Sequence, residues 1–188
     1  HVFGGGRDFE GVAVDKATGD VYLVEETKPD GNIATNSNSL FKLNPTTNEP
    51  EFICTIAEAG KTVNKGLEGI TVVGNEIWLA NQEDPTDIYR YDKVQGKVVG
   101  QLSITDARFL SDIYHDPTDD VVWCTDSKKA EIFKFNLHGK RLATYAIPAS
   151  FDKSEGIAID RQNGYIWLCS DSTGRLLRIK FKFDLKIE

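Results

Sequence analysis

Apolar and polar residues alternate along much of the chain, and the alternation recurs in four similar segments. Each segment places Glu or Ser at its third position, before an apolar stretch; the four are residues 8–15 (DFEGVAVD), 66–73 (GLEGITVV), 109–116 (FLSDIYHD) and 153–160 (KSEGIAID). A period of two residues is typical of a half-buried β-strand. No stretch of ten residues shows the 3.6-residue apolar period of a helix. The pattern therefore predicts an all-β chain.

A turn rich in Gly, Asn, Asp or Pro follows each segment, as expected of tight hairpins. The second strand after the turn carries one aromatic residue at the same place, which is Tyr22, Trp78, Trp123 or Trp167. Third strands are predicted at 40–43, 88–91, 132–135 and 176–179, and fourth strands at 51–56, 98–104, 141–147 and 184–187. Residues 27–38 interrupt the first repeat and are predicted to form an inserted polar surface loop.

The aligned positions Glu10, Glu68, Ser111 and Glu155 stand 58, 43 and 44 residues apart, and the first interval is long because it contains the inserted loop. These intervals match the length of one four-stranded propeller blade. A β-sandwich could hold as many strands, but it would not repeat one pattern four times in phase. We therefore predict a single β-propeller domain over residues 1–188. Its four visible blades are expected at about 7–57, 65–104, 108–147 and 153–188.

Charge and apolar content narrow the functional classes. The formal net charge is −7 and the pI is about 5.0. An acidic surface repels phosphate backbones, so we expect no nucleic-acid partner, whereas a cation is compatible with it. No apolar run approaches 18 residues, so no transmembrane segment is predicted.

The three cysteines each lie in an apolar, strand-like run. Cys54, Cys124 and Cys169 are odd in number and widely spaced, which predicts neither a disulfide framework nor a zinc site. We expect all three to behave as small buried hydrophobic residues.

Acidic residues recur where the repeats would bring them together. The first strand of every propeller blade lines the central channel, so Glu10, Glu68 and Glu155 are expected in a ring, with Ser111 in the fourth place and Asp112 beside it. Carboxylates crowded around an axis have raised pKa values unless a cation neutralises them. Oxygen ligands from several blades suit Ca²⁺, which accepts six to eight oxygens. Two other roles stay open: accepting backbone N–H bonds from the next blade, and acid/base catalysis.

Four segments resemble one known family of propellers. They are Asp8-Phe-Glu-Gly-Val-Ala, Gly66-Leu-Glu-Gly-Ile-Thr, Trp-Leu-Ala-Asn-Gln-Glu-Asp-Pro (78–85, followed by Ile88-Tyr-Arg-Tyr) and Ser-Glu-Gly-Ile-Ala-Ile-Asp (154–160). The chain resembles the SdiA-regulated, YjiK-like β-propellers, and more distantly the NHL-repeat, gluconolactonase-like and strictosidine synthase-like propellers. The resemblance implies a secreted, periplasmic or cell-surface protein. It also implies one blade before the first repeat seen here, which leaves a closed four-bladed ring or a five-bladed ring without its first blade.

The similarity to gluconolactonase-like propellers, which hold an axial divalent metal with Glu, Asn and Asp ligands, also bears on the site. It implies the ligands Glu10, Glu68, Asn81, Glu155 and Asp171. Further polar candidates lie on the same channel strands or at the ends of the second strands: Glu26, Gln82, Ser111, Asp112 and Asp126.

Two functions from different classes follow. The leading hypothesis is a non-catalytic extracytoplasmic propeller that binds a divalent cation, calcium by preference, near its channel. It would contact a protein or small-molecule partner through a loop face. The alternative is a metal-dependent hydrolase of a lactone, ester or phosphate ester, in which Glu10, Glu155 or Asp171 is the base. A propeller scaffold without a metal stays open as well.

Overall fold

The computed structural model describes residues 7–27, 36–62 and 64–183, and these form an all-β molecule. Blade 1 comprises β1 (Phe9–Val14), β2 (Val21–Thr27), β3 (Asn36–Leu43) and β4 (Pro50–Thr55). Blade 2 comprises β5 (Leu67–Val73), β6 (Glu76–Asn81), β7 (Asp87–Asp92) and β8 (Lys97–Ser103). Blade 3 comprises β9 (Leu110–Asp116), β10 (Val121–Asp126), β11 (Glu131–Asn136) and β12 (Arg141–Ala146). Blade 4 comprises β13 (Ser154–Asp160), β14 (Tyr165–Ser170) and β15 (Leu176–Lys180).

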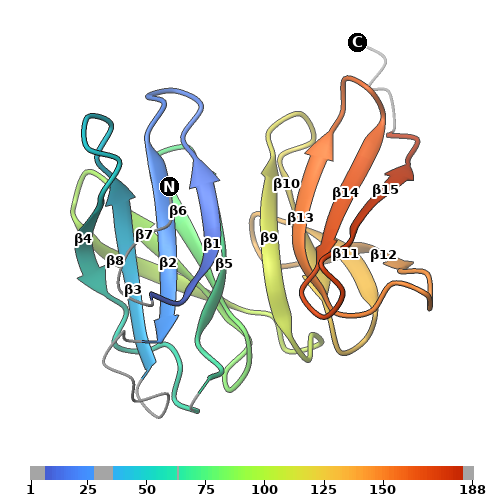
Figure 1. Cartoon of the computed structure of the whole chain (residues 1–188), viewed down its shortest axis with the longest axis horizontal. Helices are drawn as coiled ribbons and strands as arrows, with labels where there is room; N and C mark the ends of the chain where they lie inside the picture. Colours follow the sequence, from blue (N-terminus) through green and yellow to red (C-terminus); the bar gives the residue numbers. More distant parts are fainter. Residues whose placement is uncertain (1–6, 28–35, 63, 184–188) are drawn as a thin grey trace.

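Each blade is one antiparallel meander in which strands pair in chain order. The first strand of each blade is innermost, and neighbouring blades meet there: β1 contacts β5, β5 contacts β9, and β9 contacts β13. Blades 1 and 2 form the left half of the molecule in Figure 1, and blades 3 and 4 form the right half. The four sheets thus make a four-bladed β-propeller, as the repeat predicts.

The ring is open on one side. The three neighbouring pairs of innermost strands, β1 with β5, β5 with β9 and β9 with β13, make extensive contact. Among the described strands, β13 and β1 do not. We call this region, between blade 4 and blade 1, the open side.

The predicted strands agree with the observed ones, except for the fourth strand of blade 4 and the ends of the inserted loop in blade 1. The predicted fourth strand of blade 4, at 184–187, lies outside the described residues. The prediction of a loop over 27–38 is wrong at both ends, because Thr27 belongs to β2 and β3 already begins at Asn36. Polar sequence alone does not end a strand when its backbone still pairs with a neighbour.

The hydrophobic core lies between blades rather than within one centre. Three clusters fill the three junctions between successive blades, and each contains the aromatic residue of a second strand. Tyr22 packs between blades 1 and 2, Trp78 between blades 2 and 3, and Trp123 between blades 3 and 4. Large rings at these places bury much apolar area, which stabilises the contact between sheets.

Polar contacts between blades fix their register. Asp15 at the end of β1 accepts a hydrogen bond from Lys93 of blade 2 at 2.5 Å. Asp116 at the end of β9 accepts one from Arg161 of blade 4 at 2.6 Å. Both aspartates are almost completely buried, so their charges need these partners.

Glycine allows the innermost strands to approach closely. A Cβ atom at Gly69 of β5 would lie 2.8 Å from the Cα of Asp112 and 2.9 Å from the backbone nitrogen of Ile113, both in β9. Backbone atoms cannot move aside as a flexible side chain can. The glycine of the repeat is therefore required by the packing of blade on blade.

The cysteine prediction holds only in part. Cys124 is buried, Cys54 is half-buried, and Cys169 on β14 is exposed. The expectation that Cys169 is buried is wrong because β14 faces the open side, where no described sheet covers it. Among the described residues, no helix is long and apolar enough to cross a membrane.

Candidate metal centre

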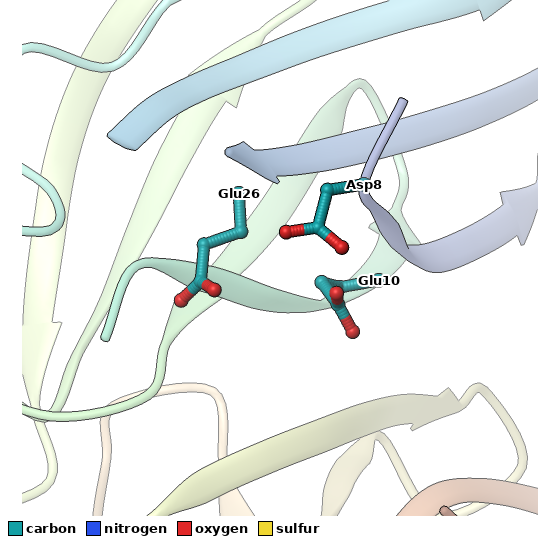
Figure 2. A group of neighbouring side chains, drawn as sticks. All are labelled: Asp8, Glu10 and Glu26. Carbon is teal, nitrogen blue, oxygen red and sulfur yellow. The ribbon is translucent and has the colours of Figure 1, made fainter. Parts of the chain in front are cut away.

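Three carboxylates converge where β1 begins and β2 ends. Figure 2 shows the side chains of Asp8, Glu10 and Glu26 directed toward one another. One oxygen from each lies within 4.8 Å of the others, which is a spacing that a single cation could bridge.

Local backbone structure produces this convergence. The ladder between β1 and β2 shifts register between Phe9 and Gly11, so Glu10 occupies a bulge. The backbone N–H of Glu26 donates a hydrogen bond to the carbonyl oxygen of Asp8 at 3.0 Å, which holds the two segments together. Bulges redirect a side chain from the regular alternation of a strand, and here Glu10 is directed toward Asp8 and Glu26.

Glu10 has a raised pKa, as expected of a carboxyl group among other acids. Burial, then a hydrogen bond with Asp8, then the charges of Asp8, Glu26 and Glu155 raise the pKa of Glu10 to about 8. Glu10 is also exposed to solvent, so water screens part of the repulsion. The direction of the shift nevertheless follows from the number of acids around it.

Glu26 is almost fully buried and has one strong backbone partner. The N–H of Gly66 donates to its Oε1 at 2.5 Å, which links the end of β2 to the start of blade 2. Burial raises the pKa of Glu26, and this hydrogen bond opposes the rise.

Glu68 and Glu155 extend the acidic region to blades 2 and 4. Glu68 is 7% exposed, and its Oε1 accepts a hydrogen bond from Nε2 of Gln82 at 2.6 Å. Burial first, and then the charges of Glu10, Glu26, Glu155 and Asp8, raise the pKa of Glu68 to about 10. Burial and the charge of Asp171 raise the pKa of Glu155. The three predicted glutamates thus belong to one electrostatic unit.

Two predicted ligands occupy other environments. The side chain of Asn81 is buried and bonded to loop backbone: its Oδ1 accepts from Gly60, and its Nδ2 donates to the carbonyls of Glu83 and Pro85. Asp171 lies in an exposed turn after β14, 3.9 Å from Lys153. Asn81 therefore holds a loop, and Asp171 reaches the acidic region only through its charge. A cluster of acids on blade 1, rather than one ligand per blade, forms the candidate centre.

The remaining channel candidates make structural contacts. The Ser111 hydroxyl donates to that of Ser127 at 2.7 Å, and Asp126 accepts backbone N–H bonds from Arg108 and Lys129. Asp112 accepts backbone N–H bonds from Ile113 and, across the blade junction, from Ile157, each at 2.8 Å.

Asp112 also receives the N–H of Ile70 in blade 2, so its carboxylate ties β5, β9 and β13 together. Burial raises its pKa to about 7, and the three backbone donors oppose that rise. The role of accepting backbone N–H bonds between blades, left open from the sequence, is therefore taken by this aspartate.

Asp8 is the one member of the carboxylate cluster that the repeat did not single out. Its equivalents in the other repeats are Gly66, Phe109 and Lys153, so the acid occurs only in blade 1. The only available signal was its closeness to Glu10 in the sequence, because the bulge that turns Glu10 toward it could not be read from the alternation.

Comparisons with known proteins support the fold. No family model matches the chain, and no curated protein matches it in sequence. Similar solved structures include a chain of a nidogen/laminin complex (18% identity, TM-score 0.65, 93% of this chain and 61% of that chain). They also include glutaminyl cyclase from Myxococcus xanthus (13% identity, TM-score 0.64, 90% and 71%). A protein of unknown function from Bacteroides caccae is similar as well (12% identity, TM-score 0.55, 93% and 61%).

These similarities define the class of protein: this chain is a β-propeller. The chain spans about three fifths of the length of the nidogen/laminin chain that it matches. At these identities the shared property is the fold, and the chemistry must be argued from the residues of this chain.

Proposed function

We propose that this propeller is a non-catalytic binding protein that holds a divalent cation, calcium by preference, at the cluster of Asp8, Glu10 and Glu26. The observation that carries the proposal is the convergence of three carboxylates within 4.8 Å. Glu68 and Glu155 are further acidic groups whose charges act on this cluster when they are ionised. Carboxylate oxygens with loose geometry favour Ca²⁺ over Mg²⁺, which requires an octahedral shell, and over Zn²⁺, which prefers nitrogen and sulfur.

The proposed cation has a structural consequence. Asp8, Glu10 and Glu26 belong to the first blade, and Glu26 is bonded to Gly66 at the start of the second. A cation at the cluster would neutralise charges that otherwise repel and would fix the junction of blades 1 and 2. Glu10 is exposed, so part of the coordination shell is left to water or to a ligand.

The proposal also covers the cellular location of the protein, its family and its binding partner. We propose an extracytoplasmic location and membership of the SdiA-regulated, YjiK-like family, on the residues that resemble that family. Extracellular calcium modules bind with dissociation constants of about 10⁻⁴ to 10⁻³ M, a range in which an incompletely enclosed site can be occupied. The similarity to a chain of a nidogen/laminin complex supports a protein partner. The hydrolase alternative lacks an observation of this kind.

Calcium titration of the metal-free protein tests the proposal. Thermal unfolding is followed in chelator-treated protein as CaCl₂ is raised, with MgCl₂ in parallel. At a free concentration 100 times the dissociation constant, binding should add about 2.7 kcal/mol to the free energy of unfolding. Isothermal calorimetry on the same samples gives the affinity directly.

Two variants separate a specific site from general charge screening. Glu26→Gln removes one carboxylate of the cluster, and Glu49→Gln removes an exposed one in the turn between β3 and β4. We expect Glu26→Gln to weaken calcium binding at least about tenfold, which is ~1.4 kcal/mol, and Glu49→Gln to leave it unchanged. Equal weakening by both, or no stabilisation at millimolar calcium, would rule out the proposed site.

A further inference from the structure

A polar cavity lies at one end of blade 2. Its volume is about 800 Å³, which is within the range of small-molecule sites in proteins. It is bounded by the loop between β6 and β7, by the first residue of β7, by the last residue of β8 and by the segment that leads from β8 to blade 3. No residue of β1–β4 or β13–β15 lines it, so it is separate both from the cluster of Asp8, Glu10 and Glu26 and from the open side.

Asp87, the first residue of β7, is a buried acid without a partner. It is 5% exposed, yet its side chain forms no hydrogen bond and no ion pair with any residue in 7–27, 36–62 or 64–183. In the same part of the chain, none of the fully enclosed side-chain atoms that lack a partner belongs to Asp87. Because Asp87 lines the cavity, its carboxyl group reaches the cavity rather than the core.

Other buried aspartates of the ring have the partners that Asp87 lacks. Asp15 accepts a hydrogen bond from Lys93, and Asp116 accepts one from Arg161. A buried carboxyl group without a donor is unfavourable, because the water lost on burial is not replaced. At Asp87 this loss is recovered if a molecule in the cavity donates to the carboxyl oxygens.

The walls of the cavity are held in place by hydrogen bonds of their own. Nδ2 of Asn81 donates to the carbonyl oxygens of Glu83 at 3.0 Å and Pro85 at 2.6 Å, which fixes the loop before β7. The N–H of Ile104 donates to the carbonyl oxygen of Thr86 at 2.9 Å, and the Thr86 hydroxyl donates to that of Ile104 at 3.1 Å. The two sides of the cavity are thereby joined, so a ligand would enter a preformed site at little cost in ordering.

The other acids of the cavity are already engaged, wholly or in part. The Glu83 carboxylate faces two ammonium groups, those of Lys65 at 3.9 Å and Lys128 at 3.6 Å. Oδ2 of Asp84 accepts a hydrogen bond from the hydroxyl of Thr62 at 2.9 Å, which leaves Oδ1 for another donor. Spare acceptor capacity is therefore concentrated on Asp87 and Asp84.

This arrangement suits an organic cation better than a metal ion. Among the described residues, three acidic side chains converge within 4.8 Å only at Asp8, Glu10 and Glu26, so the cavity lacks a comparable set of metal ligands. Its volume leaves room for a molecule of many atoms. Hydroxyl groups on the walls can donate or accept further hydrogen bonds; they belong to Thr62, Thr86, Ser103 and Thr105.

We propose that this cavity binds a small organic cation whose ammonium or guanidinium group donates hydrogen bonds to Asp87 and Asp84. An ammonium group has three N–H donors and a guanidinium group has five, and both form strong charge-assisted bonds with carboxylates. The formal net charge of −7 favours the approach of a cation. Arg108 also lines the cavity, but it is exposed, so water screens its repulsion. This site does not depend on the proposed calcium site.

An NMR titration of the isotope-labelled protein in chelator tests the proposal with butylammonium and butylguanidinium as probes. We expect the amide signals of residues 84–87 and 103–108 to shift and to saturate with both cations. Butanol and butyrate, which have the same alkyl chain without the positive charge, should give no saturating shift. Because calcium is absent, the outcome is independent of the cluster of Asp8, Glu10 and Glu26.

Asp87→Asn keeps the shape of the side chain and removes its charge. We expect it to weaken binding of butylguanidinium at least about tenfold, which is ~1.4 kcal/mol. Without ligand its melting temperature should not fall, because no hydrogen bond is lost. Asp152→Asn, an exposed aspartate outside the cavity, is the matched control and should bind as the unsubstituted protein does. Arg108→Gln should act in the opposite direction and tighten binding about twofold, since it removes a screened repulsion.

Asp84→Asn provides a second variant if Asp87→Asn folds poorly. Asp84 has a φ of 52°, a conformation that asparagine also adopts readily, and its loss should weaken binding severalfold. The proposal is overturned if neither cation gives saturating shifts, or if butanol binds as well as the cations do. It is also overturned if Asp87→Asn binds normally, or if it lowers the melting temperature of the unligated protein, because the carboxyl group would then have a structural partner.

Discussion

At the scale of single residues, Asp112 shows how one departure from the repeat changes a role. Blades 1, 2 and 4 carry glycine after the glutamate of their first strand, and blade 3 carries Asp112 instead. Its backbone packs against Gly69, and its carboxylate, beside Gly156, takes backbone donors from three innermost strands. A buried carboxylate is tolerated here because each oxygen has hydrogen-bond partners.

Replacement of this carboxylate by an amide should destabilise the ring. In Asp112→Asn the amide nitrogen must face a backbone donor, either Ile157 or Ile113, and that donor loses its acceptor. A buried donor without an acceptor costs about 1–3 kcal/mol. Urea unfolding at pH 8 measures the difference from the unsubstituted protein.

Asp171→Asn provides the matched control, because the same chemical change falls in an exposed turn. Its effect should stay within about 0.5 kcal/mol. If the two variants unfold at the same urea concentration, Asp112 does not tie the blades together in solution.

The sequence predicts only those residues of the candidate centre that recur at equivalent positions of the repeat. Glu10, Glu68 and Glu155 stand at equivalent places in three repeats, and the structure brings them into one electrostatic unit. Asp8 has no acidic equivalent, so a search for recurring acids passes over it. Asn81 ends β6, where a channel residue is expected, but its side chain bonds to the backbone of Gly60 and Pro85 in the flanking loops. These contacts depend on loop conformation, which alternation does not reveal.

At the scale of elements, strand positions follow from alternation because a strand's side chains have only two faces. The sequence predicts all fifteen described strands in kind, and most bounds within a few residues. The alternation does not reveal which strand faces are covered by a neighbouring sheet and which are exposed to solvent. Val12 and Ile70 have the same pattern around them in sequence, yet one is exposed and the other buried. Burial at a blade face depends on a neighbouring sheet, which is a long-range property.

The contact between β5 and β9 yields a prediction about glycine. Gly69→Ala places a Cβ atom 2.8 Å from the Cα of Asp112, so the two strands must move apart. Overpacking of this kind costs about 1–3 kcal/mol. Chemical denaturation of the purified variant should show the loss as a lower midpoint with an unchanged slope.

Gly100→Ala is the corresponding control in β8. Its nearest neighbour to an added Cβ atom is Nη1 of Arg90 at 3.9 Å, and its φ is not positive. Alanine there restricts the unfolded chain without a clash, and the expected change is neutral to about 1 kcal/mol of stabilisation. Equal destabilisation at both positions would mean that the loss comes from glycine content and not from blade packing.

At the scale of the whole molecule, the ring gathers acidic side chains around its axis and places basic side chains at blade junctions. Glu10, Glu26, Glu68 and Glu155 have raised pKa values. Asp15, beside Lys93, has a lowered pKa through its hydrogen bond with that lysine. As pH rises, the glutamates with raised pKa values lower the stability of the folded state, whereas Asp15 raises it. The stability of the metal-free ring should therefore have a maximum on the acidic side of neutrality.

The sign follows from proton binding in each state. Groups with raised pKa values keep their protons in the folded protein after the unfolded chain has lost them, above about pH 4.5. The folded state then binds more protons, and stability falls as pH rises, up to about 8 for Glu10 and about 10 for Glu68. Asp15 contributes stability that is present above the pKa of an unfolded aspartate, about 3.9, and is lost as pH falls below it. A maximum at about pH 4, between these two unfolded-state values, results.

Thermal or urea unfolding in chelator between pH 4 and 9 tests this profile, with Glu68→Gln as the informative variant. Each fully shifted group removes at most about 1.4 kcal/mol per pH unit. Because the amide side chain of glutamine does not ionise, the variant should show a shallower decline and should be more stable than the unsubstituted protein at pH 8. Calcium binds the ionised carboxylates, so calcium should stabilise more at pH 8 than at pH 5. A metal-free profile that is flat from pH 5 to 9 would mean that the acids around the axis are not crowded in solution, and the electrostatic basis for a cation at Asp8, Glu10 and Glu26 would be lost.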